Sequence, residues 1–426
     1  MIAEWLRDHA HPLRTLDPAD GDVSDLAPLK DVVGDARVVA IGESTHRIHE
    51  FYQLRHRLTR FLVSELGFTA FVMESGFPEG LRVDDWVHGG PGDPADLLHT
   101  GITYHMGKCA EMREHLEWLR AHEVRFHGMD VSDSAASARP AVEACVAFLA
   151  GADPAYAESV RDGLLPLFDY LPADRTGLAW AAPALHAYLA LDAGVRNELT
   201  VRIGELAERM RAQRVVYSAA TSPARFETAY RCAATARHTD AFLQAMASAR
   251  TRPYAPANLR DAAMAENVEW ILGREERIVV AAANGHVQRW PFSAPPVLPV
   301  GMTALGEHLA ASLGERMVVI ASAFGGGTLY LHRPIPDGPP GHTEVFTHEM
   351  AAPDPDSLDA LLATAGVSPY LLDLRAVPAT GPVADAFAAS TTIMTGLQAT
   401  PVNPMAAFDA VVYVDRVTPW HTFVGR

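Results

Sequence analysis

The chain has few cysteines, no long apolar run and fewer basic than acidic residues. Its three cysteines, Cys109, Cys145 and Cys232, lie far apart and form no CxxC pair, which argues against a disulfide framework or a structural zinc site. No run of about 18 apolar residues occurs, so we expect no membrane-spanning helix. Lysine and arginine number 35 against 52 acidic residues, and the net charge of −17 makes nucleic acid and anionic membranes poor partners.

What is present is typical of a globular protein. Hydrophobic residues make up 49% and charged residues 20% of the 426 residues, which excludes wholesale disorder. This length suits one domain that carries a sizeable insertion. Residues 1–16 carry charges early and lack the apolar stretch of a signal peptide, so we expect a cytoplasmic protein.

Five short apolar runs, rich in β-branched residues, end abruptly in polar or glycine residues. Their continuous rather than alternating hydrophobicity is typical of parallel strands buried on both faces. The runs are 37–42 before Glu43, 68–73 before Glu74, 124–129 before Asp130, 277–283 before Asn284, and 317–321 before Gly325–Gly327. Helical patterns at 51–66 and 111–122 lie between them. The alternation predicts an α/β fold with a mainly parallel sheet and helices on both faces.

The segment 141–272 differs, because it is rich in Ala, Leu, Arg and Glu and carries no strand pattern. We expect a large all-helical insertion that forms one wall of a cleft, carried by an α/β core of residues 1–140 and 273–426. The proline-rich stretch 333–356 predicts loops. Two further strand candidates, 370–374 and 410–417, would extend the sheet or cover its edge.

The segment Gly42-Glu-Ser-Thr-His46 is the densest chemical signal, since ligands of such sheets bind at the carboxyl ends of the strands. Gly42 would allow a tight exit from the strand, and Ser44 or Thr45 would cap the next helix. Glu43 and His46 are three residues apart, so both can point into one cleft. A carboxylate beside an imidazole raises its pKa and orients it for general-base catalysis. The alternative is a helix-capping glutamate beside a solvated histidine.

Other strand ends add candidates to the same cleft. Glu74 would place a second carboxylate there, although a capping or salt-bridged residue is the plainer interpretation. His286 would donate to a developing negative charge or act as the acid partner of His46, and a histidine satisfied within a turn is the alternative. Asn284 and Asp130 are candidates for contacts with the substrate, with helix capping an equal alternative for Asp130. Arg55, on the predicted helix, would bind an anion or an oxyanion.

Several common sites are absent. Glu43, His46, His49 and Glu50 resemble metal ligands, but six residues separate Glu43 from His49, so on a helix they would not share one face. No HExxH, phosphate-loop pattern or GxSxG elbow occurs. We therefore expect neither a metal nor another cofactor, and a plain glycine-rich turn at 325–327.

Five separated motifs resemble those of the erythromycin-esterase-like family. They are Gly42-Glu-Ser-Thr-His46 with His49-Glu-Phe51 and Arg55, Phe71-Val-Met-Glu-Ser75, His127-Gly-Met-Asp130, Arg260-Asp-Ala-Ala-Met-Ala-Glu-Asn267, and Asn284-Gly-His286-Val287. Each is weak alone, but together and in this order they are specific, and Phe408-Asp-Ala-Val-Val-Tyr413 also fits. The resemblance implies lactone hydrolysis without a covalent intermediate. His46 would activate water, Glu43 and Glu74 would orient the histidine and the water, and Arg55 would bind substrate or the oxyanion.

Two positions depart from the family pattern. The late motif usually reads His-Asn-x-His, and Ala283 stands here in place of the first histidine; Arg47 stands where glycine is common. We therefore expect a hydrolase of a small-molecule ester, especially a lactone, but not efficient macrolide cleavage. One alternative is a cyclase or other acid/base enzyme of natural-product metabolism, and another is a ligand-sequestering resistance protein without turnover.

Overall fold

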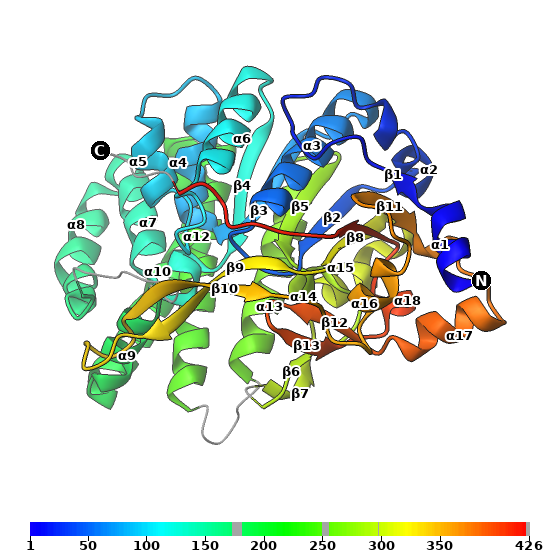
Figure 1. The fold of residues 1–426 in the computed structure, drawn as a ribbon. Helices are drawn as coiled ribbons and strands as arrows, with labels where there is room; N and C mark the ends of the chain where they lie inside the picture. Colours follow the sequence, from blue (N-terminus) through cyan, green and yellow to red (C-terminus); the bar gives the residue numbers. More distant parts are fainter. Residues whose placement is uncertain (173–180, 249–254, 297, 423–426) are drawn as a thin grey trace.

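An eight-stranded sheet forms the centre of the protein (Figure 1). The structure is a computed structural model that describes residues 1–172, 181–248, 255–296 and 298–422. The six strands from β14 to β4 are parallel to their neighbours, and β11 and β1 extend one edge antiparallel. In spatial order the strands are β1 (His11–Pro12), β11 (Tyr370–Asp373), β14 (Ala410–Val414), β8 (Met317–Phe324), β2 (Val38–Glu43), β5 (Ile278–Ala283), β3 (Ala70–Gly76) and β4 (Arg125–Asp130).

Both faces of this sheet are covered by helices, as the continuous apolar runs predict. Along β2, Val39 and Ile41 point to one face, whereas Val38 and Ala40 point to the other, because strand side chains alternate. The first face packs against α2 (Leu29–Val33), α3 (His49–Leu66), α4 (Phe77–Val87), α5 (Pro94–Thr100) and α6 (Ala110–Ala121). The second packs against α1 (Ile2–His9), α13 (Ala255–Leu272), α14 (Asn284–Val287), α15 (Leu305–Leu313), α16 (Leu358–Ala363), α17 (Pro382–Ala389) and α18 (Pro404–Ala407). The predicted α/β fold is confirmed.

Helices follow one another between β4 and β5. They are α7 (Arg139–Ala152), α8 (Pro154–Gly163), α9 (Ala181–Ala190), α10 (Ala193–Ala212), α11 (Arg214–Ala220), α12 (Pro223–Ala247) and α13. The apolar side chains of α7 to α12 form a hydrophobic cluster of their own, whereas α13 packs on the second face of the sheet. Of the predicted insertion 141–272, residues 173–180 and 249–254 lie outside the described part of the chain. The division into core and insertion stays a prediction.

Two local predictions are wrong, the loop at 333–356 and the cap of α3. The supposed loop 333–356 contains β10 (Thr343–Met350), which pairs antiparallel with β9 (Gly327–Pro334). The prolines between Pro334 and Pro340 lie at the end of β9 and in the connection, while the residues after it, rich in Thr, Val and Phe, favour a strand. Ser44 and Thr45 do not cap α3, because that helix begins only at His49. The remaining small sheets are β6 (Phe292–Ala294) with β7 (Leu298–Met302), and β12 (Thr392–Thr395) with β13 (Gln398–Pro401).

The C-terminal segment, residues 415–422, crosses in front of the sheet (Figure 1, red). It forms isolated bridges with three distant parts of the chain, in which Val417 pairs with Gly327, Pro419 with Ile48, and Thr422 with Cys109. The segment thus joins the start of β9 to the starts of α3 and α6. None of the described helices is both long and apolar enough to cross a membrane.

Gly42 is required by a close approach of β2 to the turn that follows β5. A Cβ atom at this position would lie 2.2 Å from Oδ1 of Asn284 and 3.2 Å from its Cα. The Asn284 amide cannot turn away without loss, because its Nδ2 donates to Ser44 Oγ and to the carbonyl of Ser322. The glycine therefore serves close packing, and not the tight exit that the sequence suggested.

We predict that Gly42→Ala lowers the free energy of unfolding by about 1–3 kcal/mol, the usual cost of overpacking a filled core. Gly204→Ala is the matched control, because Gly204 lies inside α10 and a Cβ there meets no atom within 4 Å. That change should stabilise the helix by up to about 1 kcal/mol. Urea denaturation of both variants measures the difference, and equal effects would contradict the packing account.

Candidate active site

The strand order brings the predicted residues to one edge of the sheet. Four neighbouring strands, β2, β5, β3 and β4, end side by side, although they are far apart in sequence. Glu43 ends β2 and is in register with Ala283 at the end of β5. Glu74 lies at an irregular pairing near the end of β3, and Asp130 ends β4. The candidate carboxylates therefore meet where a doubly covered parallel sheet binds ligands.

His46 is fixed by Glu43. The imidazole Nδ1 lies 2.6 Å from Oε1 of Glu43, which orients the ring and leaves Nε2 pointing elsewhere. The Glu43 side chain is 7% exposed, but that of His46 is 37% exposed. Burial works against protonation of His46, but the hydrogen bond and charge of Glu43, together with the charge of Glu74, raise its pKa. The pair is a buried carboxylate that holds a partly exposed imidazole.

Arg55 lies behind Glu43 rather than in front of it. Its Nη1 is 3.6 Å from Glu43 Oε2, and its guanidinium stacks over the Tyr52 ring at 4.0 Å. The Arg55 residue is 4% exposed, on the buried side of α3. In this arrangement it supports the Glu43 carboxylate and does not face open solvent.

Glu74 and His286 form a second pair, which Asp261 extends. Nε2 of His286 lies 3.3 Å from Glu74 Oε1, and Nδ1 lies 2.9 Å from Asp261 Oδ2. Burial opposes the charge on His286, but the two carboxylates outweigh it and raise its pKa to about 10. Burial would raise the pKa of Glu74, but His286 and Arg260 hold it well below its usual value. His286 is therefore a cation at neutral pH, a donor rather than a base.

Arg260 joins the strand ends to helix α13. Its Nη2 donates to Glu74 Oε1 at 3.0 Å and to Asp130 Oδ2 at 2.7 Å, and its Nε donates to Asp130 Oδ1 at 3.0 Å. Asp130 is fully buried, so this contact compensates a charge that has no access to water. Asp130 also accepts a hydrogen bond from the Val131 N–H. Its side chain is thus occupied within the protein.

Asn284 and Ser44 fasten the ends of β2 and β5 to β8. Ser44 Oγ donates to the Ser322 carbonyl, and the Ser322 N–H donates to Asn284 Oδ1. Both Ser44 and Asn284 are almost fully buried. The Asn284 amide makes its hydrogen bonds inside the protein, so it holds the strand ends together and does not point at a ligand in this structure.

Arg47 holds the loop of His46 in place. Its φ of +66° lies in the left-handed region, which agrees with the glycine common at this position in the resembled family. Nη1 lies 2.6 Å from His332 Nε2, Nη2 donates to the Tyr104 carbonyl, and the Arg47 carbonyl accepts from the Trp420 N–H. The side chain is buried, and this burial lowers its pKa to about 10. β9, the α5–α6 connection and the C-terminal segment thus converge on one residue beside His46.

Arg260 and Asp261 are the site residues that reasoning from the strand pattern missed. Both lie on α13, more than 100 residues after β4, so no local period connects them with the strand ends. The available signal was their presence in the fourth family motif. Helix α13 presents them to Asp130, Glu74 and His286 side by side.

A cavity of about 820 Å³ lies next to the charged residues. Residues of α4, of the α5–α6 connection and of α7 line it, among them Glu79 and Tyr104, together with Asp133 from the turn between β4 and α7. Glu43 and His46 do not line it, but the Tyr104 ring lies against the Arg260 guanidinium, 5.4 Å from centroid to Cζ. Burial and the nearby Asp133 carboxylate raise the pKa of Glu79. The volume is in the range of small-molecule sites.

Comparison with known proteins gives one consistent family. The model of the erythromycin esterase family matches residues 63–417. Erythromycin esterase type II of Escherichia coli is 27% identical over 390 residues, covering 88% of this chain and 89% of that protein.

Two solved structures share the fold. A Bacillus cereus protein superposes with a TM-score of 0.80 at 24% identity, covering 99% of this chain and 98% of that one. A mutant of the erythromycin esterase EreC in its open conformation gives a TM-score of 0.79 at 20% identity, covering 97% and 99%.

The raised pKa of His286 predicts a loss of stability in alkaline solution. A group whose pKa rises from about 6.5 unfolded to about 10 folded stabilises the protein fully below pH 6.5, and this stabilisation is lost as the pH rises through 10. Between these limits the contribution falls by about 1.4 kcal/mol per pH unit. We expect the difference in unfolding free energy between the unaltered protein and His286→Gln to shrink steadily from pH 7 to pH 9.

Urea denaturation at each pH measures this difference. Ring nitrogen NMR provides the control, since the His286 signal, assigned through the variant, should remain that of an imidazolium at pH 8. A neutral His286 at pH 8, or a difference that does not change with pH, would contradict the assigned charge.

Proposed function

The chain belongs to the erythromycin esterase family and is an esterase-like hydrolase of small molecules, and we propose that it cleaves a lactone through a water molecule activated by His46. The observation that carries the proposal is the contact between His46 Nδ1 and Glu43 Oε1 at 2.6 Å. Glu43 fixes the ring and the tautomer, so Nε2 of the neutral ring is left as an acceptor. Nε2 makes no hydrogen bond to the described part of the chain, and the side chain is partly exposed.

The reaction follows from this arrangement. Nε2 of His46 takes a proton from water as the water oxygen attacks the ester carbonyl, and a tetrahedral oxyanion forms. The bond from carbon to the leaving alkoxide then breaks, and His46 returns the proton to the alkoxide oxygen. The product of a lactone is one ring-opened molecule that carries an alcohol and, after loss of its acid proton, a carboxylate. Glu43 stabilises the imidazolium between these two steps.

Direct attack by water is favoured over an acyl-enzyme. Ser44, the hydroxyl closest in sequence to Glu43, is 1% exposed and donates its proton to the Ser322 carbonyl. The three cysteine thiols are buried as well. These side chains are therefore poorly placed to attack a substrate, whereas His46 has solvent at its ring.

His286 and Arg260 supply positive charge at the same edge of the sheet. His286 and Arg260 remain protonated, and their side chains keep 15% and 14% of their exposure. We assign to them the stabilisation of the oxyanion, with Glu74 holding both in position. Glu74 also accepts the N–H of Ala283 at 3.0 Å, which fixes the strand end opposite Glu43.

The part of the substrate away from the ester would occupy the neighbouring cavity. The cavity of about 820 Å³ is lined in part by α7, the first helix after β4, so the helices between β4 and β5 would form the predicted cleft wall. Asn284, Asp130 and Arg55 would position the site from within the protein, because their side chains are buried and engaged.

We predict that His46→Asn lowers kcat by roughly 10²–10⁴-fold, the usual loss when a general base is removed. The assay is cleavage of a panel of lactones and esters in ¹⁸O-labelled water, followed by mass spectrometry. The unaltered enzyme should place one label in the carboxylate product. A cyclase would incorporate none, and a sequestering protein would release its ligand unchanged.

His348→Asn is the matched control, because His348 is an exposed histidine on β10 outside the site. It should keep full activity, and circular dichroism should show both variants folded. Full turnover by a folded His46→Asn variant would remove the base from the proposal.

Ala283 predicts poor activity on macrolides. The family pattern has an imidazole where this chain has a methyl group, directly across from Glu43. Loss of one donor to the oxyanion or leaving group costs about 3 kcal/mol, or roughly 10²-fold in rate. We expect weak cleavage of 14-membered macrolides and better turnover of lactones with more acidic leaving groups, measured as kcat/KM.

Ala283→His tests the same position by restoring the histidine of the family pattern. The Ala283 side chain is partly exposed, so the added ring should leave the fold intact, as thermal denaturation can show. Efficient macrolide opening by the unaltered protein would show that the missing histidine is dispensable.

A further inference from the structure

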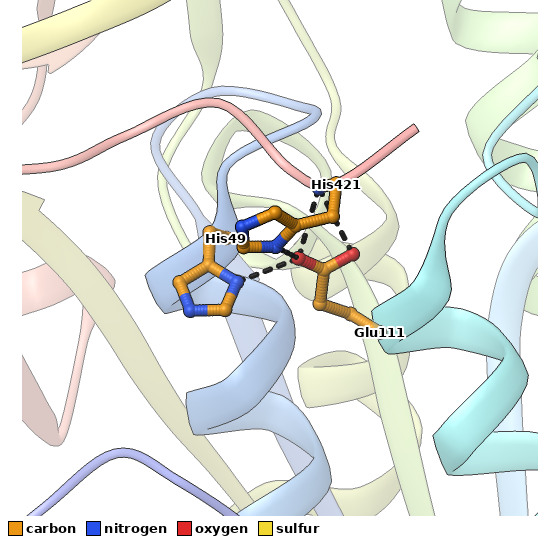
Figure 2. A group of neighbouring side chains, drawn as sticks. All are labelled: His49, Glu111 and His421. Atoms are coloured by element: carbon orange, nitrogen blue, oxygen red, sulfur yellow. Dashed lines mark hydrogen bonds and ion pairs between the residues drawn. The ribbon is translucent and has the colours of Figure 1, made fainter. Parts of the chain in front are cut away.

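A second group of chemically active side chains lies outside the proposed catalytic residues. His49 at the start of α3, Glu111 at the start of α6, and His421 in the C-terminal segment point toward one another (Figure 2). One ligand atom of each lies within 4.8 Å of the other two. We propose that these three residues bind a divalent transition-metal ion, with Zn²⁺ as the representative case.

The geometry centres on one carboxylate oxygen. Nδ1 of His49 lies 2.6 Å and Nδ1 of His421 lies 2.7 Å from Oε1 of Glu111. The two imidazole rings are nearly perpendicular, with centroids 4.7 Å apart. An ion with bonds of about 2.0–2.1 Å to nitrogen and oxygen needs ligand atoms about 3.3 Å apart, so each Nδ1 must move away from Oε1 of Glu111 by less than about 1 Å. Small rotations of two side chains provide this movement.

The three side chains suit a cation that is intermediate between hard and soft, such as Zn²⁺. Two imidazoles and one carboxylate are the ligand set of many three-ligand zinc sites, in which water completes the tetrahedron. Glu111 is 5% exposed and comes with a fixed orientation, because the backbone N–H of His421 also donates to it. His421 is 69% exposed, which leaves room for water ligands and an entry path for the ion.

Both rings meet the same oxygen through Nδ1, so without an ion each ring donates its Nδ1 proton to Oε1 of Glu111. A neutral ring that binds an ion through Nδ1 carries its proton on Nε2 instead, and the ion then contacts all three ligands at once. The two contacts at 2.6–2.7 Å are thus a preformed arrangement that an ion can enter.

An ion at this site would replace the expectation of a chain without metal. Catalysis would still not depend on the ion. That expectation considered His49 together with Glu43 and His46, whereas the structure pairs His49 with Glu111 instead. Within the described residues, no hydrogen bond or ion pair joins the three proposed ligands to Glu43, His46, Glu74 or His286. The ion would therefore be structural.

Its structural effect would fall on the C-terminal segment. Thr418 donates to Glu50, Trp420 donates to the Arg47 carbonyl, and Ala110 donates to the His421 carbonyl. These contacts dock the segment on α3, on the loop of His46 and on α6. A bound ion would add one further link at the outer end of the docked segment.

The test uses the full chain without a polyhistidine tag, dialysed against EDTA and then titrated with ZnCl₂ in a calorimeter. We expect one equivalent to bind and the Tm to rise with the Zn²⁺ concentration. His421→Ala should weaken Zn²⁺ binding by more than the roughly 10- to 100-fold that follows loss of an outer-shell residue. Glu111→Gln should have a similar effect.

Two control variants locate the ion. His348→Ala removes an exposed histidine outside the group and should bind Zn²⁺ as the unaltered chain does. His46→Asn should also keep one equivalent, because His46 is not a ligand. No binding above background, or binding that survives His421→Ala and is lost in His46→Asn, would overturn the proposal. Neither result bears on the hydrolytic function, which the lactone assay measures separately.

Discussion

The ion contacts of Arg260 are the interaction on which the site depends. The Arg260 guanidinium compensates carboxylates from two strands, and it lies 3.3 Å from Nε2 of a second cation, His286. The cluster contains four buried carboxylates, those of Glu43, Glu74, Asp130 and Asp261. Three cationic side chains lie beside them, those of Arg55, Arg260 and His286. One net negative charge remains, and it favours the protonated form of His46. The raised pKa of His46 is therefore a property of the whole cluster, because buried charges must be balanced.

Distant parts of the chain hold this cluster in shape. Helix α13 brings Arg260 and Asp261 to the strand ends, and β8 holds the β2 and β5 ends through Ser322. On the other side, β9 and the C-terminal segment fix the loop of His46 through Arg47. His46 is thus partly exposed while the residues that support it are buried, which suits the proposed base, because that residue must meet water without changing orientation.

The elements and residues that follow from local patterns were predictable. Continuous apolar runs identified the central strands, and the polar residues after them identified Glu43, Glu74, Asp130 and His286, because parallel strands share one carboxyl edge. The roles of individual residues were less accessible. Asp261 depends on the docking of α13, and the packing role of Gly42 depends on the turn after β5. The prolines before β10 made this segment look like a loop, and local propensity does not show that β9 supplies a partner strand for it.

The order of strands along the chain has a consequence for folding during synthesis. β2 is made early, but its neighbours β5 and β8 follow more than 200 residues later, as in the pairs of Val38 with Ile278 and Met317. Until then both edges of β2 lack their partners, the condition in which nascent chains are prone to wrong association. The loop after β2 is completed later still, because the Arg47 carbonyl accepts its hydrogen bond from the Trp420 N–H. His46 therefore belongs to the part of the protein that is translated first and completed last.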